Sequence, residues 1–232
     1  MQEANFLYQL TLEDFQDTNT LKHIYSNKIH NYYISFDFSE EFYIAQAKAG
    51  FIATSIFIDN HFLLLPEIQF EYAVLNFQDL HISKKVEKIL KKENYKFYID
   101  RNIDLVLENL NLYHKDNWLI KEYEILIKKL FEMQRYDFSI KTFELYDDND
   151  FLVAAEVGYK INNTYTSLSG FSSKEKIHRD FGKAQMVLTA RYLEKNGYHF
   201  WNLGHPFMQY KFDLGAKKFS RDEFLKLWYK SI

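Results

Sequence analysis

The stretch HRDFGKAQM, residues 178–186, lies between a serine-rich segment and an apolar helical pattern. It places Arg179, Gly182 and Ala184 in the spacing R-x-x-G-x-A. Glycine permits close backbone approach, and the first amides of a helix have no intrahelical partner, so this spacing is typical of a loop that holds a phosphate. Arg179 or Lys183 would complement the anion. A simple turn at a helix N-terminus is the alternative, and the spacing leaves both open.

The segments on either side of this loop predict the fold. Turn residues separate three strand-like runs before it, at 136–147, 151–161 and 163–172. An amphipathic run, an apolar strand and a short helix follow it. This order resembles the core of the GNAT acyltransferase fold, an α+β fold with a mixed, mainly antiparallel sheet and flanking helices. In that fold two central strands part and face the acyl donor, and here the pair would be 163–171 and 198–203.

The chain is expected to form two domains: a small αβ domain over 1–65 and a GNAT-like acyltransferase domain over 66–232. In the first, Asp37 or Ser39 caps a helix that Gly50 ends, and an apolar strand follows. In the second, the apolar periodicity predicts further helices at 82–93, 102–112 and 120–134.

Composition narrows the class of protein. Of the 232 residues 47% are apolar, enough for a well-filled core, and the absence of cysteine excludes disulfides and a thiol nucleophile. The eight histidines show no paired spacing, so no metal and no cofactor is expected. A net charge of −3 argues against nucleic-acid binding through overall charge. The start MQEANFLYQL lacks signal-peptide features and no long apolar run occurs, which predicts a cytoplasmic protein without membrane contact. The protein is also expected to be a monomer.

A local basic face is still expected on the helix ISKKVEKILKK, residues 82–92. Its apolar residues share one side, and four lysines lie on the other. With Lys85 these lysines form the lysine group of this helix: Lys84, Lys85, Lys88, Lys91 and Lys92. A solvated lysine face is the usual explanation of such a pattern, and a contact surface for a phosphate backbone is the alternative.

Polar residues near the predicted strands are the candidate catalytic groups. Glu156 lies within the run VAAEVGY, where a half-buried carboxylate would serve as a general base with a raised pKa, and a solvated carboxylate would not. Four more polar residues cluster after the strand at 198–203: Asn202, His205, Gln209 and Tyr210. Each could position or protonate a reacting group, although polar residues are common after a strand.

From about residue 32 to the C-terminus the chain resembles the leucyl/phenylalanyl-tRNA-protein transferases. The likeness covers FDFSEEFYIAQAKAGF, AVLNFQDLHISKKVEKILKK and NWLIKEYEILIKKLFE, and continues through SIKTFELYDDNDFLVAAEVGY, SGFSS and the tripeptide 214–216. The chain departs from the family at three motifs. It has no W-W-S-P tract, the Glu of G-E-S-M-F falls on Leu168, and D-C-Q aligns with residues 202–204.

The tail also resembles the arginyl-tRNA-protein transferases and their bacterial leucyl-transferring relatives. Residues 203–204, Met208, 210–211 and 223–225 carry this second likeness. The chain is therefore interpreted as a divergent member of the wider aminoacyl-tRNA-protein transferase superfamily.

This resemblance implies an aminoacyltransferase that moves an amino acid from aminoacyl-tRNA to the N-terminal amine of an acceptor protein or peptide, as in N-degron tagging. The implied substrate-binding residues are Trp118, Leu168, Ser169, Arg179, Gly182 and Lys183, with the lysine helix on the acceptor arm. Asn202 and Tyr210 would orient the reacting groups, and Glu156 is the candidate base. The alternatives are a coenzyme A-dependent GNAT N-acyltransferase and a catalytically inactive relative that binds tRNA or peptide.

Overall fold

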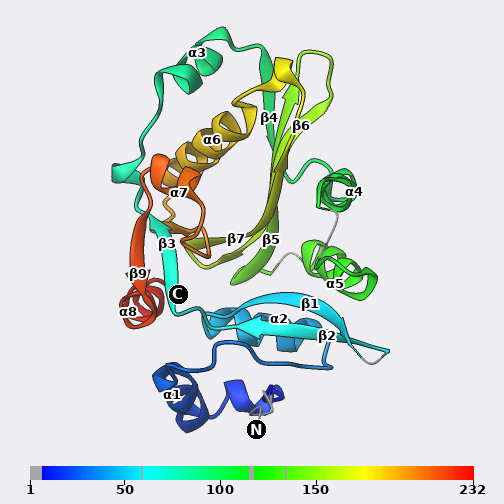
Figure 1. Cartoon of the computed structure of the whole chain (residues 1–232), viewed down its shortest axis with the longest axis vertical. Helices are drawn as coiled ribbons and strands as arrows, with labels where there is room; N and C mark the ends of the chain where they lie inside the picture. Colours follow the sequence, from blue (N-terminus) through cyan, green and yellow to red (C-terminus); the bar gives the residue numbers. More distant parts are fainter. Residues whose placement is uncertain (1–6, 59, 115–117, 134) are drawn as a thin grey trace, which may run out of the picture.

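A computed structural model describes residues 7–58, 60–114, 118–133 and 135–232. One sheet of seven strands dominates the described part of the chain, in the order β4-β5-β6-β7-β8-β3-β9 (Figure 1). Its strands are β3 (Glu71–Leu75), β4 (Tyr95–Ile99), β5 (Phe138–Asp147), β6 (Leu152–Ile161), β7 (Thr164–Ser172), β8 (Phe200–Asn202) and β9 (Lys217–Ser220). All neighbours are antiparallel except β7 and β8, which run parallel. The predicted α+β class with a mixed, mainly antiparallel sheet is confirmed.

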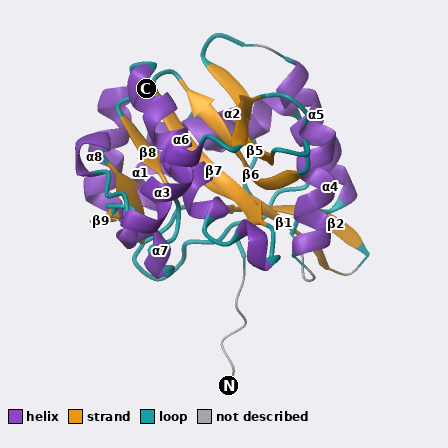
Figure 2. Ribbon diagram, turned by 90° about the horizontal axis from the view of Figure 1, so that it is seen from above, coloured by secondary structure: helices purple, strands orange, loops and turns teal. Residues whose placement is uncertain are grey.

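Helices cover both faces of this sheet. Helices α4 (Ile103–Tyr113) and α5 (Lys121–Glu132) lie on one side, while α6 (Phe181–Lys195) packs along the other and carries α3 (Lys84–Lys92) on its outer surface (Figures 1 and 2). The short helix α7 (Gln209–Asp213) lies on the same side as α6, whereas the buried side chains of the terminal helix α8 (Arg221–Ser231) join the core on the side of α4 and α5. The helices expected at 82–93, 102–112 and 120–134 are therefore present: the first and third are shorter than expected, and the second is shifted by one residue. Residue 134 lies outside the described residues.

The N-terminal part contains α1 (Thr18–Ser26), α2 (Glu40–Lys48) and a separate hairpin of β1 (Ile52–Ile58) and β2 (His61–Glu67). The Ser39 hydroxyl caps α2 by accepting from the Phe42 amide, and Gly50 follows the helix with a φ of +85°. Both sequence predictions are thus confirmed. Residues 1–6, which carry most of the start compared with a signal peptide, lie outside the described residues.

One apolar core connects the N-terminal part to the large sheet. It joins Phe42 and Phe51 to Tyr159 of β6 and Trp228 of α8. This core contains residues from both sides of residue 65. The predicted domain boundary at that point stays a prediction.

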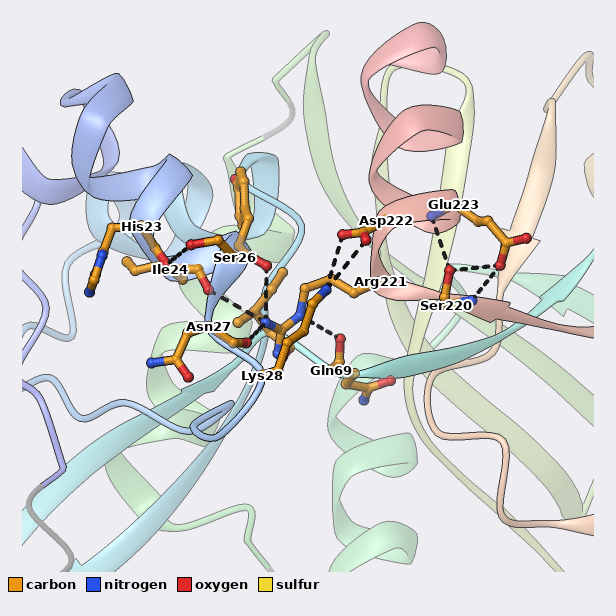
Figure 3. Close-up of polar contacts among 12 residues, drawn as sticks. His23, Ile24, Ser26, Asn27, Lys28, Gln69, Ser220, Arg221, Asp222 and Glu223 are labelled. Atoms are coloured by element: carbon orange, nitrogen blue, oxygen red, sulfur yellow. Dashed lines mark hydrogen bonds and ion pairs between the residues drawn. The ribbon is translucent and has the colours of Figure 1, made fainter.

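Arg221, the first residue of α8, fastens these two parts together (Figure 3). The residue is 1% exposed, and within the described part of the chain its guanidinium donates to backbone carbonyls. Nη2 donates to Ile68 at 2.7 Å and Nε to Gln69 at 3.0 Å, both after β2, while Nη1 donates to the carbonyls at the end of α1, including Asn27. Burial lowers the pKa of Arg221, yet the side chain stays charged because its ordinary pKa is so high.

None of the described helices has both the length and the apolar character that a membrane crossing requires.

Candidate active site

The parallel strands β7 and β8 part after three residue pairs. Thr164 to Thr166 of β7 pair with Phe200 to Asn202 of β8, where β8 ends, while β7 continues to Ser172. The chain after β8 turns to the other neighbour, because the Leu203 amide donates to Ala73 of β3. The strand pair expected to part, 163–171 and 198–203, is therefore confirmed. Beyond Thr166, β7 stays paired with β6 on one side, and its other side faces the opening.

Glu156 of β6 lies beside this opening, opposite Gly170 of β7, and is only 6% exposed. The Ser167 hydroxyl donates to its Oε1 at 3.2 Å, and the indole Nε1 of Trp201 donates to Ser167 Oγ at 2.8 Å. Burial raises the pKa of Glu156 to about 7, against the opposing effect of the neighbouring hydroxyls and of the charge on Lys211. The interpretation of Glu156 as a solvated strand residue is therefore wrong. Its carboxylate is buried, and burial raises its pKa.

A bulge in β7 shapes the strand beside this carboxylate. Ser169 pairs with Val157 and Ser167 with Gly158, so Leu168 is an extra residue between them. A Cβ at Gly158 would lie 2.3 Å from the Thr166 carbonyl oxygen, so only glycine fits there. Leu168, a predicted substrate-binding residue, is half-buried and packs against the apolar core.

Ser169, also predicted to bind substrate, lies on the far side of the bulge. Its hydroxyl lies 3.5 Å from Nε2 of His114, the residue after α4, and that nitrogen is also 3.2 Å from the Gly170 carbonyl. His114 thus approaches the β7 edge near the opening, and no sequence pattern had singled it out.

Lys211 of α7 is a second buried charged group at this site, and the sequence did not identify it as a candidate. It is 7% exposed, and its Nζ donates to the carbonyls of Leu203 at 2.5 Å and His205 at 2.7 Å. Burial lowers the pKa of Lys211 to about 8, while the negative charge of Glu156 acts in the opposite direction. The signal available in the sequence was a lysine on a short helix shortly after a core strand.

Asn202 and Tyr210 occupy different environments around the opening. Asn202 is 1% exposed, and its amide is engaged internally, accepting from the Gly204 amide at 3.0 Å and donating to Thr166 Oγ1 at 3.4 Å. Its contacts shape the end of β8. Tyr210 is 39% exposed, and desolvation raises the pKa of its hydroxyl. The catalytic roles of both stay predictions.

The two other polar residues of this cluster have partners elsewhere. His205 Nε2 lies 2.8 Å from Oε2 of the buried Glu67, and Gln209 Nε2 donates to Asp213 at 3.1 Å. Within the described ranges no three or more acidic or histidine side chains are placed to hold a metal ion.

The loop that precedes α6 borders a cavity of about 380 Å³. Its lining includes Lys174, Arg179, Gly182 and Lys183, and the guanidinium end of Arg179 is exposed. No side chain caps the start of α6, where Asp180 has a φ of +68°, so the first amides of the helix are available to an anion. This geometry keeps the phosphate-binding interpretation of R-x-x-G-x-A in place.

Packing gives Gly182 a second role. A Cβ at this position would lie 2.8 Å from Cβ of Ser172 at the end of β7. The glycine is therefore required by the close approach of helix and strand, whether or not a phosphate binds beside it.

A smaller cavity of about 190 Å³ lies between α3, α6 and α7. His81 and Ser83 line it from the start of α3, and Tyr210 lines it from α7. Lys183 borders both cavities, which connects the loop before α6 with the lysine helix.

Helix α3 has the amphipathic form that its sequence predicts. Val86 and Leu90 are buried against α6, whereas the candidate tRNA-binding lysines are exposed: Lys84, Lys85, Lys88, Lys91 and Lys92. Lys84 and Lys85 stand in the first turn, where the helix dipole disfavours cations. An anion bound near that turn would relieve this cost.

Trp118, a predicted substrate-binding residue, packs on Tyr123 with ring centroids 5.2 Å apart, and its role stays a prediction. Its carbonyl accepts from the Ser55 hydroxyl of β1. Among the described residues, the linings of the two cavities do not include it.

Fold and site together define a GNAT-like protein, with a mainly antiparallel sheet that opens at one parallel strand pair. The chain belongs to the leucyl/phenylalanyl-tRNA protein transferase family, whose model matches residues 74–229, more than half of its length. This family is one of aminoacyltransferases. The match lies within the predicted second domain, 66–232.

Individual relatives are distant. A leucyl/phenylalanyl-tRNA–protein transferase of Maridesulfovibrio salexigens is 23% identical over 158 residues, which cover 66% of this chain and 62% of the relative. The chain thus spans less than two thirds of that relative's length. The solved structure of FemX is 9% identical, with a TM-score of 0.50 over 95% of this chain and 80% of FemX. A GCN5-related N-acetyltransferase from Kribbella flavida is 9% identical, with a TM-score of 0.41 over 90% of this chain and 73% of that structure.

Proposed function

We propose that this protein transfers an amino acid from aminoacyl-tRNA to the N-terminal amine of an acceptor protein or peptide, as in N-degron tagging. One observation carries the proposal beyond family membership: the buried carboxylate of Glu156 lies where β7 and β8 part. A carboxylate with a pKa of about 7 is suited to take a proton from an amine at neutral pH.

The reaction requires little more than positioning of the two substrates, because the ester bond of aminoacyl-tRNA is already activated. Holding the amine against the ester carbonyl supplies about 7 to 11 kcal/mol of the barrier reduction. A general base adds about 10² to 10⁴ in rate. Departure from the D-C-Q motif at Asn202 is therefore compatible with activity.

In the proposed mechanism the proton travels through Ser167. The acceptor amine donates to Ser167 Oγ, whose own proton passes to Glu156, while the amine nitrogen attacks the ester carbonyl. The tetrahedral intermediate then collapses and forms the new amide bond. The terminal ribose oxygen of the tRNA leaves and regains the proton from Glu156 through the same hydroxyl. Trp201 holds that hydroxyl in place by donating to its oxygen.

The donor would approach from the side of α3 and α6. The exposed lysines of α3 contact the phosphates of the acceptor arm, and the first amides of α6 with Arg179 and Lys183 take a phosphate near the 3′-end. Lys183 borders both cavities, and the smaller one is lined from the start of α3 and by Tyr210.

A coenzyme A-dependent N-acyltransferase is the second candidate, favoured by the cavity of about 380 Å³ beside R-x-x-G-x-A. Thermal unfolding with acetyl-coenzyme A or with charged tRNA separates the two. A ligand at 100 times its Kd stabilises a protein by about 2.7 kcal/mol. The proposal expects a shift with charged tRNA and none with acetyl-coenzyme A. A shift with acetyl-coenzyme A alone contradicts it, and tRNA binding without transfer to any peptide identifies an inactive binding protein.

A further inference from the structure

We propose that Lys211 is a positioning residue of this site, which fixes the loop after β8 and places a buried positive charge beside the buried carboxylate of Glu156. The role of Lys211 in catalysis rests on the proposed function. Its contacts and its effect on Glu156 do not depend on tRNA.

The first half of the proposal follows from the contacts of Nζ. The two carbonyls that accept from it belong to Leu203 and His205, on either side of Gly204, whose φ is +72°. Asn202 accepts from the Gly204 amide from within the strand. Lys211 and Asn202 therefore hold the same tight loop from two directions, just where β8 leaves β7.

The second half follows from charge and burial. An ammonium group with 7% of its residue exposed has lost most of its water, and two carbonyl dipoles compensate only part of that loss. Glu156, on a different element, is the charged group whose interaction with Lys211 raises its pKa. The titratable groups that interact electrostatically with Glu156 are Tyr165 from β7 and Tyr210 and Lys211 from α7. Of these only Lys211 carries a positive charge.

The two roles can be separated by substitution. Lys211→Gln keeps one hydrogen-bond donor for the loop but removes the charge, whereas Lys211→Arg keeps both charge and donors. If the lysine only holds the loop, loss of charge leaves the ionisation of Glu156 unchanged. If it sets the charge state, loss of charge makes Glu156 hold its proton to higher pH.

The direct test is an NMR titration of full-length protein labelled with ¹³C at the glutamate carboxyl groups, with Glu156→Gln identifying the resonance. The expected result is an upward shift of the Glu156 midpoint by about one pH unit in Lys211→Gln and a near-normal midpoint in Lys211→Arg. An unchanged midpoint in folded Lys211→Gln overturns the proposal. If Lys211→Gln does not fold, ¹³C-lysine labelling of the Glu156→Gln variant tests the reciprocal effect. The Lys211 midpoint must then fall, and an unchanged value overturns the proposal.

Transfer assays add the functional consequence. With Lys211→Gln the acid limb of kcat/KM should move to higher pH together with the Glu156 midpoint, while tRNA affinity stays unchanged. If the wild type transfers nothing to any acceptor, the proposed function fails, and the titration still decides the coupling of Lys211 to Glu156 independently.

Discussion

The indole Nε1 of Trp201 donates to the hydroxyl oxygen of Ser167 at 2.8 Å, across the point where β8 ends and β7 continues. The hydroxyl proton of Ser167 is thereby left for Glu156, which accepts it at 3.2 Å. A fully buried tryptophan of the core thus orients the group that passes protons at the opening of the sheet.

Replacing Trp201 by Phe should lower the transfer rate by about 3- to 10-fold, because Ser167 loses the donor that orients it, a net interaction of roughly 1 kcal/mol. Trp228→Phe is the matched control. Its indole is equally buried but donates to the Lys48 carbonyl, outside the site. Steady-state transfer assays on both variants, normalised to folded protein, measure the effect. Equal losses of activity in the two variants would assign Trp201 to packing alone.

Glu156→Gln should change the pH dependence of stability. The pKa of Glu156 in the folded state, about 7, lies above the ordinary value of 4.5, so the folded protein binds this proton more tightly than the unfolded chain does. The contribution of protonated Glu156 to the free energy of unfolding is fully present below about pH 4.5, and it is lost as pH rises through 7. The variant should therefore gain on the order of 2 kcal/mol relative to wild type between pH 5 and pH 8. Urea unfolding at both pH values measures this difference, and a constant difference contradicts a buried, titrating Glu156.

Arg221→Leu should destabilise the protein on the order of 3 kcal/mol, since carbonyls from α1 and from the segment after β2 lose a buried donor together. Arg221→Lys should recover only part of this loss, because an ammonium group cannot reach carbonyls on both sides as the planar guanidinium does. Arg179→Leu, at an exposed arginine, is the control. Thermal unfolding measures all three. A wild-type melting temperature for Arg221→Leu would mean that the two parts of the molecule are joined by the apolar core alone.

The sequence predicted the sheet around the site because its elements have strong local signals. The alternating runs that became β5, β6 and β7, the cap at Ser39 and the glycine after α2 all depend on neighbouring residues. The site was less predictable. Whether Glu156 is buried depends on α6 packing against β6 and β7, and the role of Lys211 depends on the carbonyls of a loop six to eight residues away. Such tertiary contacts leave no periodic pattern in the chain.

Changing Lys84, Lys88 and Lys91 of α3 to Gln should weaken tRNA binding and flatten its salt dependence. Each phosphate contact contributes roughly one unit or slightly less to the slope of log affinity against log salt, so a loss of two to three contacts should lower the slope by about 2. Lys226, Lys230 and Lys195, which are exposed on other helices, provide a control triple of equal charge change. Filter binding from low to moderate salt measures both triples. Equal weakening by both would show that the charge of α3 acts only through the net charge of the protein.

Transfer of an amino acid to a defined peptide is the direct test of the proposed aminoacyltransferase activity. The protein is incubated with a mixture of aminoacylated tRNAs and a set of peptides that differ at the N-terminal residue, and the intact mass of every peptide is recorded. We expect a gain of one amino-acid residue on at least one peptide, abolished when that N-terminus is acetylated and slowed about 10²-fold or more in Glu156→Gln. Peptides that gain no residue from any charged tRNA, but become acetylated when acetyl-coenzyme A is supplied, would contradict it.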